Sequence, residues 1–196
     1  MPTEISFVHL RQAAQIIHDG GVIAYPTESV FGFGCDPDRY DAVLRILELK
    51  ERAAAAGLIL IAADRSQLDG WIEPAADEEA ALSGTDAFVT WVVTADAHCP
   101  DWVTGGRRTC AVRLTRHPVA AALCREAGMP IVSTSVNRHG RPPATTALAV
   151  RRRFGRHVDF IMPGTTGDTN RPSEIRAART GAILRQIGRA SCRERV

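Results

Sequence analysis

The chain has 196 residues, of which 45% are hydrophobic and 23% are charged, and its formal net charge at pH 7 is +2. This composition is ordinary for a soluble globular protein with one buried core, and the charge is too small to indicate a nucleic-acid-binding protein. The apolar runs are strand-sized, and the amino terminus lacks the charged-then-apolar order of a signal peptide. We therefore expect neither membrane insertion nor secretion, and a cytoplasmic location.

The first elements expected along the chain are a helix over residues 6–19 and a strand over residues 22–25. Ser6 is a candidate N-cap, two glycines end the helical pattern, and one helical face is expected to carry Val8, Ala13, Ile16 and Ile17. Residues 26–36 combine glycines, hydroxyl groups and a carboxylate directly after the strand, which predicts a ligand-binding loop. The sequence has neither a G-x-G-x-x-G fingerprint nor a Walker A motif, so a nucleotide would have to be held in another way.

The next predicted helix carries the only lysine among the 24 lysine and arginine residues. Apolar residues at helical spacing place Lys50 and Arg52 in the last turn of this helix, before a predicted strand over residues 58–62; they are Tyr40, Val43, Leu44 and Leu47. A lysine is a compact, rotatable point charge, so its retention in an arginine-rich chain favours contact with a phosphate or carboxylate. The spacing alone equally allows two cations that merely complement the helix dipole.

The middle of the chain is expected to form two short helices, a strand, a loop and a second strand, over residues 68–71, 77–82, 87–94, 95–108 and 110–115. The second strand contains Arg113. A cation inside an apolar strand needs a partner or a ligand if it is buried, because an unpaired buried charge is costly. The alternative is that Arg113 faces water at the sheet surface, and the pattern leaves both open.

The last third of the chain is expected to form a helix, a strand, a second helix and strand, a long loop and two final strands. The helices are expected over residues 117–127 and 145–154, and the loop over residues 163–172. The strands are expected from residue 130 onward and over residues 158–162, 173–176 and 182–186. The strand that begins at Pro130 runs into Ser133, Thr134, Ser135 and Asn137, whose hydrogen-bonding side chains form either a turn or part of a site. No repeat or linker divides the chain. We expect one domain over residues 1–188 and a polar tail over residues 189–196 that is disordered or an expression remnant.

Cysteine and histidine spacing predicts no metal site. The five cysteines are widely spaced without a Cys-x-x-Cys pair, so we expect free thiols, with Cys110 and Cys124 as small buried side chains. The six histidines lack the spacing of metal ligands on a helix. Arginines cluster at residues 107–108, 138–141 and 151–153, where they form either solvated faces or a basic rim, so weak tRNA contact is a secondary hypothesis.

Six short motifs are spread along nearly all of residues 8–188. They are Tyr-Pro-Thr-Glu at 25–28 with Gly-x-Gly-Cys-Asp at 32–36, Lys-x-Arg at 50–52, Ala-Val-Arg at 111–113 with His-Pro at 117–118, Ser-Thr-Ser-x-Asn at 133–137, Pro-Ser-Glu-Ile at 172–175, and Leu-Arg at 184–185. In this order and spacing they resemble the motifs of the YrdC/TsaC family, the bacterial threonylcarbamoyl-AMP synthases.

The resemblance implies an α/β fold, a twisted, mixed open sheet flanked by helices around a basic cavity. Family members condense L-threonine, bicarbonate and ATP to threonylcarbamoyl-AMP and pyrophosphate. The product serves a downstream transferase complex that forms N6-threonylcarbamoyladenosine in tRNA. ATP would bring Mg²⁺ on its phosphates, and no tightly bound cofactor and no metal held by the protein are implied.

The resemblance also implies the roles of individual residues. A catalytic tetrad is matched by Lys50, Arg52, Ser135 and Asn137. Threonine binding is matched by Thr27, Arg113 and Ser173, and ATP binding by Lys50, Arg52, Thr90, Ser133, Asn137 and Arg185. The reaction needs positioning and charge neutralisation more than covalent help, so we expect Ser135 to be a hydrogen-bonding group and not a nucleophile.

The chain departs from the family pattern in two segments. Family members usually follow Lys-x-Arg with a proline and a second lysine, where this chain has only alanines at 53–56, and residues 85–90 replace a Pro-Gly-Pro-x-Thr turn. Retention of both Lys50-x-Arg52 and Ser135-x-Asn137 favours a synthase. The missing lysine favours two alternatives: an RNA-binding accessory protein of tRNA or ribosome maturation, or an inactive paralogue with the same fold.

Overall fold

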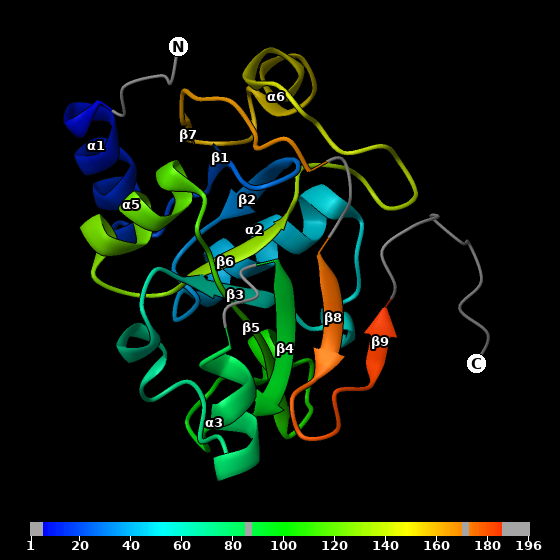
Figure 1. The fold of residues 1–196 in the computed structure, drawn as a ribbon. Coiled ribbons are helices and arrows are strands. Elements are labelled where there is room, and N and C mark those ends of the chain that lie inside the picture. Colours follow the sequence, from blue (N-terminus) through cyan, green and yellow to red (C-terminus); the bar gives the residue numbers. More distant parts are fainter. Residues whose placement is uncertain (1–5, 85–87, 170–172, 186–196) are drawn as a thin grey trace.

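The computed structural model describes residues 6–84, 88–169 and 173–185, without the side chain of Arg185, and its centre is a sheet of nine strands in these residues (Figure 1). The strands are β1 (Ile23–Pro26), β2 (Phe31–Gly34), β3 (Ile59–Ala62), β4 (Val89–Thr94), β5 (Thr109–Leu114), β6 (Ile131–Ser135), β7 (Phe160–Ile161), β8 (Glu174–Ala177) and β9 (Ile183–Arg185). Their order is β7-β1-β2-β6-β3-β5-β4-β8-β9. Strand pairs β1–β7, β3–β5 and β4–β8 are parallel and the other pairs are antiparallel. The predicted α/β class with a mixed open sheet is confirmed.

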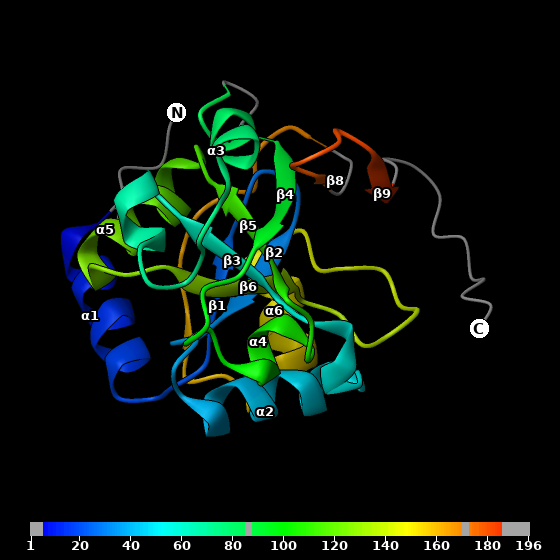
Figure 2. The ribbon, with the colours of Figure 1, turned by 90° about the horizontal axis from the view of Figure 1, so that it is seen from below.

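Helices cover both faces of this sheet (Figure 2). Side chains alternate between the two faces along each strand, so Ile23 and Ile61 pack with α1 (Phe7–His18) and α5 (Pro118–Ala127). Their neighbours Ala24 and Leu60 point the other way, into the core under the helices α2 (Tyr40–Lys50), α4 (Asp101–Thr104) and α6 (Ala147–Phe154). Both faces are apolar over most of their area, which explains why the strands read as continuous hydrophobic runs.

The predicted loop over residues 26–36 contains a strand, which corrects the expectation from sequence. β2 forms an antiparallel hairpin with β1, in which Tyr25 pairs with Gly32 and Ile23 pairs with Gly34. The glycines hid this strand because they have low β propensity. Gly34 is needed there because a Cβ atom at this position would lie 2.6 Å from Cε1 of Tyr25, whose ring packs against the backbone of β2.

The helix boundaries and faces also differ from some expectations. In α1 the buried face contains Leu10, Ala13, Ala14 and Ile17, whereas Val8 is 71% exposed, so its predicted place on the buried face is wrong. The expectation that Arg52 belongs to the last helical turn is also wrong. α2 ends at Lys50 because Glu51 adopts a left-handed conformation with φ of 53°, and Arg52 lies in the connection that follows.

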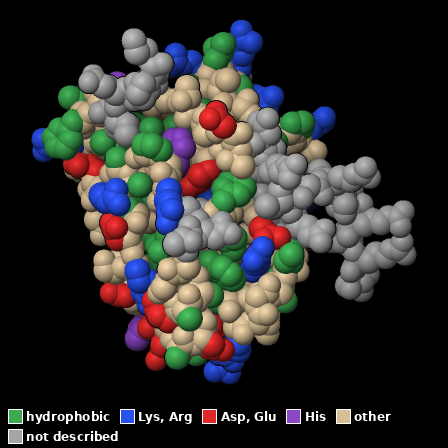
Figure 3. Space-filling view, in the orientation of Figure 1, with side chains coloured by type: hydrophobic (Ala, Val, Ile, Leu, Met, Phe, Trp, Pro, Cys, Tyr) green, Lys and Arg blue, Asp and Glu red, His purple; other side chains and the backbone are tan. Residues whose placement is uncertain are grey.

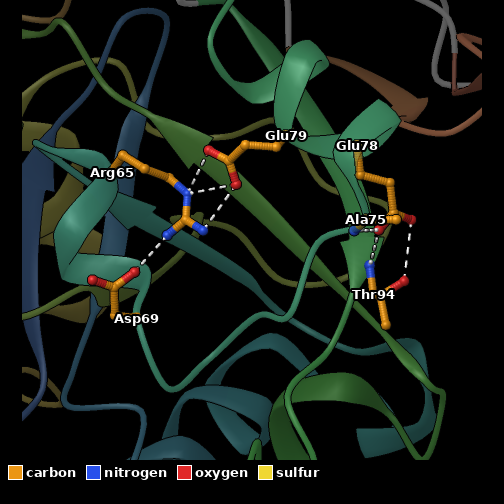
Figure 4. Close-up of polar contacts among 6 residues, drawn as sticks. All are labelled: Arg65, Asp69, Ala75, Glu78, Glu79 and Thr94. Atoms are coloured by element: carbon orange, nitrogen blue, oxygen red, sulfur yellow. Dashed lines mark hydrogen bonds and ion pairs between the residues drawn. The ribbon is translucent and has the colours of Figure 1, made fainter.

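Short helical segments account for the remaining differences. The 3₁₀ turns η1 (Ala54–Ala56) and η2 (Arg65–Leu68) flank β3, and η2 lies just before the helix expected around residues 68–71. α4 occupies part of the predicted loop 95–108. α3 (Ala76–Leu82) is fastened to β4 by the buried Glu78 carboxylate, which accepts hydrogen bonds from Ala75 and Thr94 (Figure 4).

Other predictions can be compared with the described part of the chain. Cys110 and Cys124 are buried and unpaired as predicted, together with Cys35 and Cys99. None of the helices in the described part of the chain combines the length and the apolar character of a membrane span. The single domain over residues 1–188 stays a prediction, and the tail over residues 189–196 lies outside the described residues.

Candidate functional site

The strand register brings the predicted site residues of the central strands to one face of the sheet. Ser133 on β6 lies opposite Ile59 on β3, and Ile59 lies opposite Ala111 on β5. Residues two positions apart on a strand share a face, so Ser135 and Arg113 point to the same side as this row. Val92 on β4 pairs with Ala111 and lies on this face. Thr90 is two positions before Val92 on the same strand, so its side chain points to this face as well.

Lys50 lies at the end of α2, and its ammonium reaches the end of β6. Its Nζ atom donates to the carbonyl oxygens of Ser135 and Asn137 and lies 3.1 Å from Oδ1 of Asn137. Ser135 Oγ donates to the same Asn137 Oδ1 over 2.6 Å. The sequence separations are 85 and 87 residues, so tertiary folding brings together three of the four residues assigned to the tetrad.

The environment of Lys50 perturbs its ionisation. The residue is 5% exposed, and burial together with the nearby Arg52 lowers the pKa of its ammonium to about 8. The oxygen atoms around Nζ favour the charged form, so the ammonium is present at neutral pH. Arg52, the fourth residue assigned to the tetrad, is half-buried and donates to the carbonyl of Ala56 over 3.2 Å.

Gly32 lies between Thr27, which was assigned to threonine, and Ser133, which was assigned to ATP. A Cβ atom at this glycine would lie 3.3 Å from Cγ2 of Thr27 and 3.4 Å from Oγ of Ser133. Gly32 pairs with Ser135 across the β2–β6 ladder, so the Lys50 end of the site is continuous with the β1–β2 turn. Thr27 itself donates to the carbonyl of Val30, which shapes this turn.

Arg113 is buried beside a carboxylate. Its guanidinium lies 3.5 Å from Oε2 of Glu28, and the two side chains are 9% and 13% exposed. The other Glu28 oxygen accepts a 2.6 Å hydrogen bond from Thr115. Burial works against ionisation of Glu28, but Arg113 and Thr115 outweigh it, and the pKa of this carboxyl lies below its usual range. The solvent-facing alternative for Arg113 is therefore wrong.

His117 supports this charged pair from the start of α5. Its Nε2 atom is 3.1 Å from the carbonyl oxygen of Thr165, and its Nδ1 accepts the Ala120 N–H as the N-cap of the helix. Burial lowers the pKa of His117 below its usual range, so the ring is neutral at pH 7. Both ring nitrogens are engaged, and the residue fixes the loop around Thr165 in place.

The last described part of the site lies where β4 meets β8. Thr90 and Ser173 are both buried, and their hydroxyl oxygens are 2.9 Å apart. Arg185 ends β9, but its side chain lies outside the described residues, so its assignment to ATP stays a prediction. Figure 3 shows acidic, basic and histidine side chains close together between α5 and the upper end of β4.

Sequence reasoning missed the part played by Glu28. The residue was recognised only as part of a motif, although a buried arginine in an apolar strand requires a counter-ion. Thr115, two positions after Arg113, holds this counter-ion and was also missed. The described residues contain no group of three or more His, Cys, Asp or Glu side chains that could hold a metal ion.

The fold and the site define a class of protein: a mixed open-sheet α/β protein in which hydroxyl groups and buried cations at the strand ends are suited to anionic groups. The family model for Sua5, YciO and YrdC proteins, described as "Telomere recombination", matches residues 15–186. The chain therefore belongs to this family, which confirms the resemblance stated from the sequence.

Two relatives of similar length are both named threonylcarbamoyl-AMP synthase. A threonylcarbamoyl-AMP synthase of Nitrosococcus oceani is 54% identical over 178 residues, which cover 90% of this chain and 96% of the relative. The threonylcarbamoyl-AMP synthase of Halorhodospira halophila is 49% identical over 179 residues, or 90% of this chain and 94% of the relative.

Solved structures share the fold. P. abyssi Sua5 complexed with L-threonine has a TM-score of 0.84 and 31% identity over 91% of this chain. The match covers 54% of that Sua5 chain, so the present chain spans about half its length. E. coli YciO has a TM-score of 0.80 at 24% identity, covering 91% of this chain and 88% of YciO, and it supports the fold alone.

Proposed function

We propose that the chain is an L-threonylcarbamoyladenylate synthase that condenses L-threonine, bicarbonate and ATP to threonylcarbamoyl-AMP and pyrophosphate. Its product would serve a transferase complex that forms N6-threonylcarbamoyladenosine in tRNA. The observation that carries the proposal is the meeting of Lys50 with Ser135 and Asn137 at the end of β6, where the Ser135 side chain points to the same sheet face as Arg113. The names of the relatives support the same activity.

The chemistry suits a site of buried cations and hydroxyl groups. The threonine amine captures carbon dioxide or bicarbonate, and a carbamate oxygen then attacks the α-phosphorus of ATP and expels pyrophosphate. Negative charge gathers on the phosphate oxygens in this step, and Lys50, Arg52 and Arg185 are the residues we assign to neutralise it. The reaction class is nucleotidyl transfer, with Mg²⁺ carried on the substrate phosphates, and we place it in the cytoplasm.

Ser135 acts as a hydrogen-bonding group in this proposal. Its Oγ donates to Oδ1 of Asn137, and Nζ of Lys50 lies 3.4 Å away. A serine nucleophile needs an adjacent base to take its proton. The described neighbours of Oγ are an amide oxygen and an ammonium, and neither is such a base.

Pyrophosphate release tests the proposal. The protein is incubated with ATP, Mg²⁺ and bicarbonate, with and without L-threonine, and pyrophosphate is measured. We expect threonine-dependent release that is abolished by Lys50→Ala and by Arg52→Ala, because each removes a cation assigned to the triphosphate. Circular dichroism checks that both variants remain folded.

A matched control is Arg125→Ala. Arg125 is 58% exposed and pairs with the equally exposed Asp64, so its removal leaves the site intact and release should be unchanged. Normal release by both Lys50→Ala and Arg52→Ala would show that the assigned roles are wrong. Release that does not depend on threonine would exclude the synthase.

RNA contact is a second candidate function, favoured by one surface. The three arginines at residues 151–153 of α6 are exposed, and so are Arg138, Arg141 and Arg156. Such a patch binds phosphates without base specificity and loses affinity steeply with salt. Binding of tRNA at 50 and 200 mM salt tests it, and an affinity that does not depend on salt would exclude it.

A further inference from the structure

The turn that follows Arg52 has no side chain that could hold its own shape. Residues 53–56 are alanines, all of them are exposed, and the last three form the 3₁₀ turn η1. A single 3₁₀ turn has poor hydrogen-bond geometry and is weakly stable by itself. The conformation of η1 therefore depends on contacts with another part of the chain.

The loop after α4 packs against this turn, backbone to backbone. Gly57 and Gly105 both have positive φ, 66° and 70°. A Cβ atom at Gly105 would lie 2.6 Å from the carbonyl oxygen of Ala55 and 2.8 Å from the nitrogen of Gly57. Beside this contact, the N–H of Leu58 donates to the carbonyl of Val103 over 2.8 Å. The two loops are thus in direct contact at the start of β3.

Arg107 ties the two loops together with its side chain. Its Nη2 atom donates to the carbonyl of Ala55 over 2.7 Å, and its Nη1 atom donates to the carbonyl of Thr104 over 3.2 Å. A guanidinium group has donors at fixed angles, so it can join two carbonyls in one geometry. Among the described residues no carboxylate pairs with Arg107, and these two carbonyls are the acceptors of its side chain.

Arg52 is bound to the same turn. Its guanidinium donates to the carbonyl of Ala56, the residue after the one that Arg107 contacts. The backbone N–H of Arg52 donates to the carbonyl of Leu47 in α2 over 3.0 Å. The backbone of Arg52 is therefore fixed by α2, and its side chain is oriented by η1. A residue that holds η1 in place also sets the direction of this guanidinium.

We propose that Arg107 is a positioning residue that fixes the turn η1 and thereby holds Arg52 toward the triphosphate of ATP. The inference rests on the proposed function and deepens it, because it names a residue outside the assigned site that sets the affinity for ATP. The other interpretation is that Arg107 itself contacts the triphosphate through its remaining N–H groups.

Steady-state kinetics of pyrophosphate release give the first test. Arg107→Ala should raise the KM for ATP about fivefold, because Arg52 loses its fixed orientation. The KM for L-threonine should stay unchanged, since the threonine assignment depends on β5 and the β1–β2 turn. An unchanged KM for ATP would overturn the inference, and so would an equal rise of both KM values, which indicates a general loss of structure.

A double-mutant cycle separates the two interpretations. The measured quantity is the Kd of a Mg²⁺-loaded ATP analogue that cannot release pyrophosphate. Arg107→Ala should raise this Kd about fivefold in the wild-type protein, and by less than about twofold in the Arg52→Ala background, because Arg107 acts through Arg52. Equal effects in the two backgrounds would mean that Arg107 contacts the triphosphate directly, which overturns the positioning role.

A proline gives a second test that does not need the weak-binding Arg52→Ala variant. Ala53 has φ of −66° and ψ of 142°, which proline adopts without strain, and its N–H donates to none of the described backbone carbonyls. Ala53→Pro stiffens the turn from within the chain. It should return the Kd of Arg107→Ala to within about twofold of the wild-type value. A proline carries no charge, so a Kd that stays raised would again favour direct phosphate contact.

Arg108→Ala is the matched control on the next residue. The Arg108 side chain is exposed and makes no hydrogen bond or ion pair with the described residues, so both KM values and the Kd should be unchanged. A wild-type protein that releases no pyrophosphate with threonine would overturn the proposed function, while the Kd values would still test the link between Arg107 and Arg52. Normal release by the wild type with an unchanged KM for ATP in Arg107→Ala would overturn only the inference.

Discussion

Lys50 has an ammonium that the fold has withdrawn from water and surrounded with oxygen atoms. An arginine could not replace it, because a planar guanidinium group is too wide to donate to the closely spaced carbonyl oxygens of Ser135 and Asn137. The single lysine of the chain is therefore explained by geometry that its sequence neighbours do not reveal. Burial lowers its pKa to about 8, close to the working range of an enzyme.

This pKa predicts that ATP binding weakens as the pH rises. A lysine with a pKa of about 8 is protonated at pH 7 and loses its charge as the pH rises through 8. If the triphosphate needs the ammonium, the Kd for ATP should increase about tenfold between pH 7 and pH 9. Calorimetry without threonine and bicarbonate isolates this effect from the chemistry.

The control for this pH dependence is Lys50→Met, which should bind ATP weakly at both pH values. A wild-type Kd that stays constant to pH 9 would mean that the ammonium does not face the triphosphate. The same dependence in Lys50→Met would assign it to another group.

Residues of the site differed in how far the sequence could predict them. Lys50 and Asn137 stood out by composition and motif, and the structure joins them directly. Arg113 posed a question that the sequence left open, because a period-two pattern does not say which face of a strand is buried. Glu28 could have been inferred as the counter-ion of Arg113 only after that burial was known.

At the scale of elements, long apolar runs were predicted well and glycine-rich ones were not. α5 and β6 lie close to the ranges expected, since Pro118 and Gly128 mark the ends of α5 and Pro130 comes just before β6. β2 was missed because two of its four residues are glycines, of which Gly34 makes room for the ring of Tyr25. α2 stopped earlier than expected because a left-handed Glu51 ended it, which no residue preference indicates.

The attachment of α3 to β4 gives a prediction about stability. The Glu78 carboxylate accepts hydrogen bonds from the N–H of Ala75 and from the N–H and hydroxyl of Thr94 (Figure 4), and its side chain is 5% exposed. Glu78→Ala removes the acceptor of these three part-buried hydrogen bonds. It should lower the free energy of unfolding by about 1–3 kcal/mol, measured by urea denaturation.

Glu79→Ala is the comparison on the next residue of the same helix. Glu79 pairs with Arg65 at side-chain exposures of 40% and 31%, where ion pairs contribute at most about 1 kcal/mol. Its removal should therefore cost less than that of Glu78. Equal costs for the two variants would mean that the buried network does not fasten the helix.

For the whole molecule, the sheet order is what assembles the site. β6 lies between β2 and β3 in the sheet. In the sequence it follows β2 by about 100 residues and β3 by about 70 residues. The α/β class follows from alternating helices and strands, but composition and periodicity do not specify a mixed order such as this. The family resemblance, and not the local pattern, carried the prediction of the mixed open sheet.

Because the site draws on strands from both halves of the sheet, its ligands should stabilise the whole molecule. A ligand at 100 times its Kd adds about 2.7 kcal/mol to the free energy of unfolding. For a chain of this size, that raises Tm by roughly 5–10 °C. L-Threonine, and separately a Mg²⁺-loaded ATP analogue that cannot release pyrophosphate, should each produce such a shift in a thermal denaturation experiment.

The variant Arg52→Ala separates the two halves of the assigned site in this experiment. Arg52 lies two residues after Lys50, whereas the threonine assignment depends on Arg113 in β5, so the variant should lose the shift caused by the analogue and keep the shift caused by threonine. Loss of both shifts would mean that Arg52 supports the fold of the entire site. Retention of both would place the triphosphate away from the end of α2, and the assignment of the phosphate-binding cations would then be wrong.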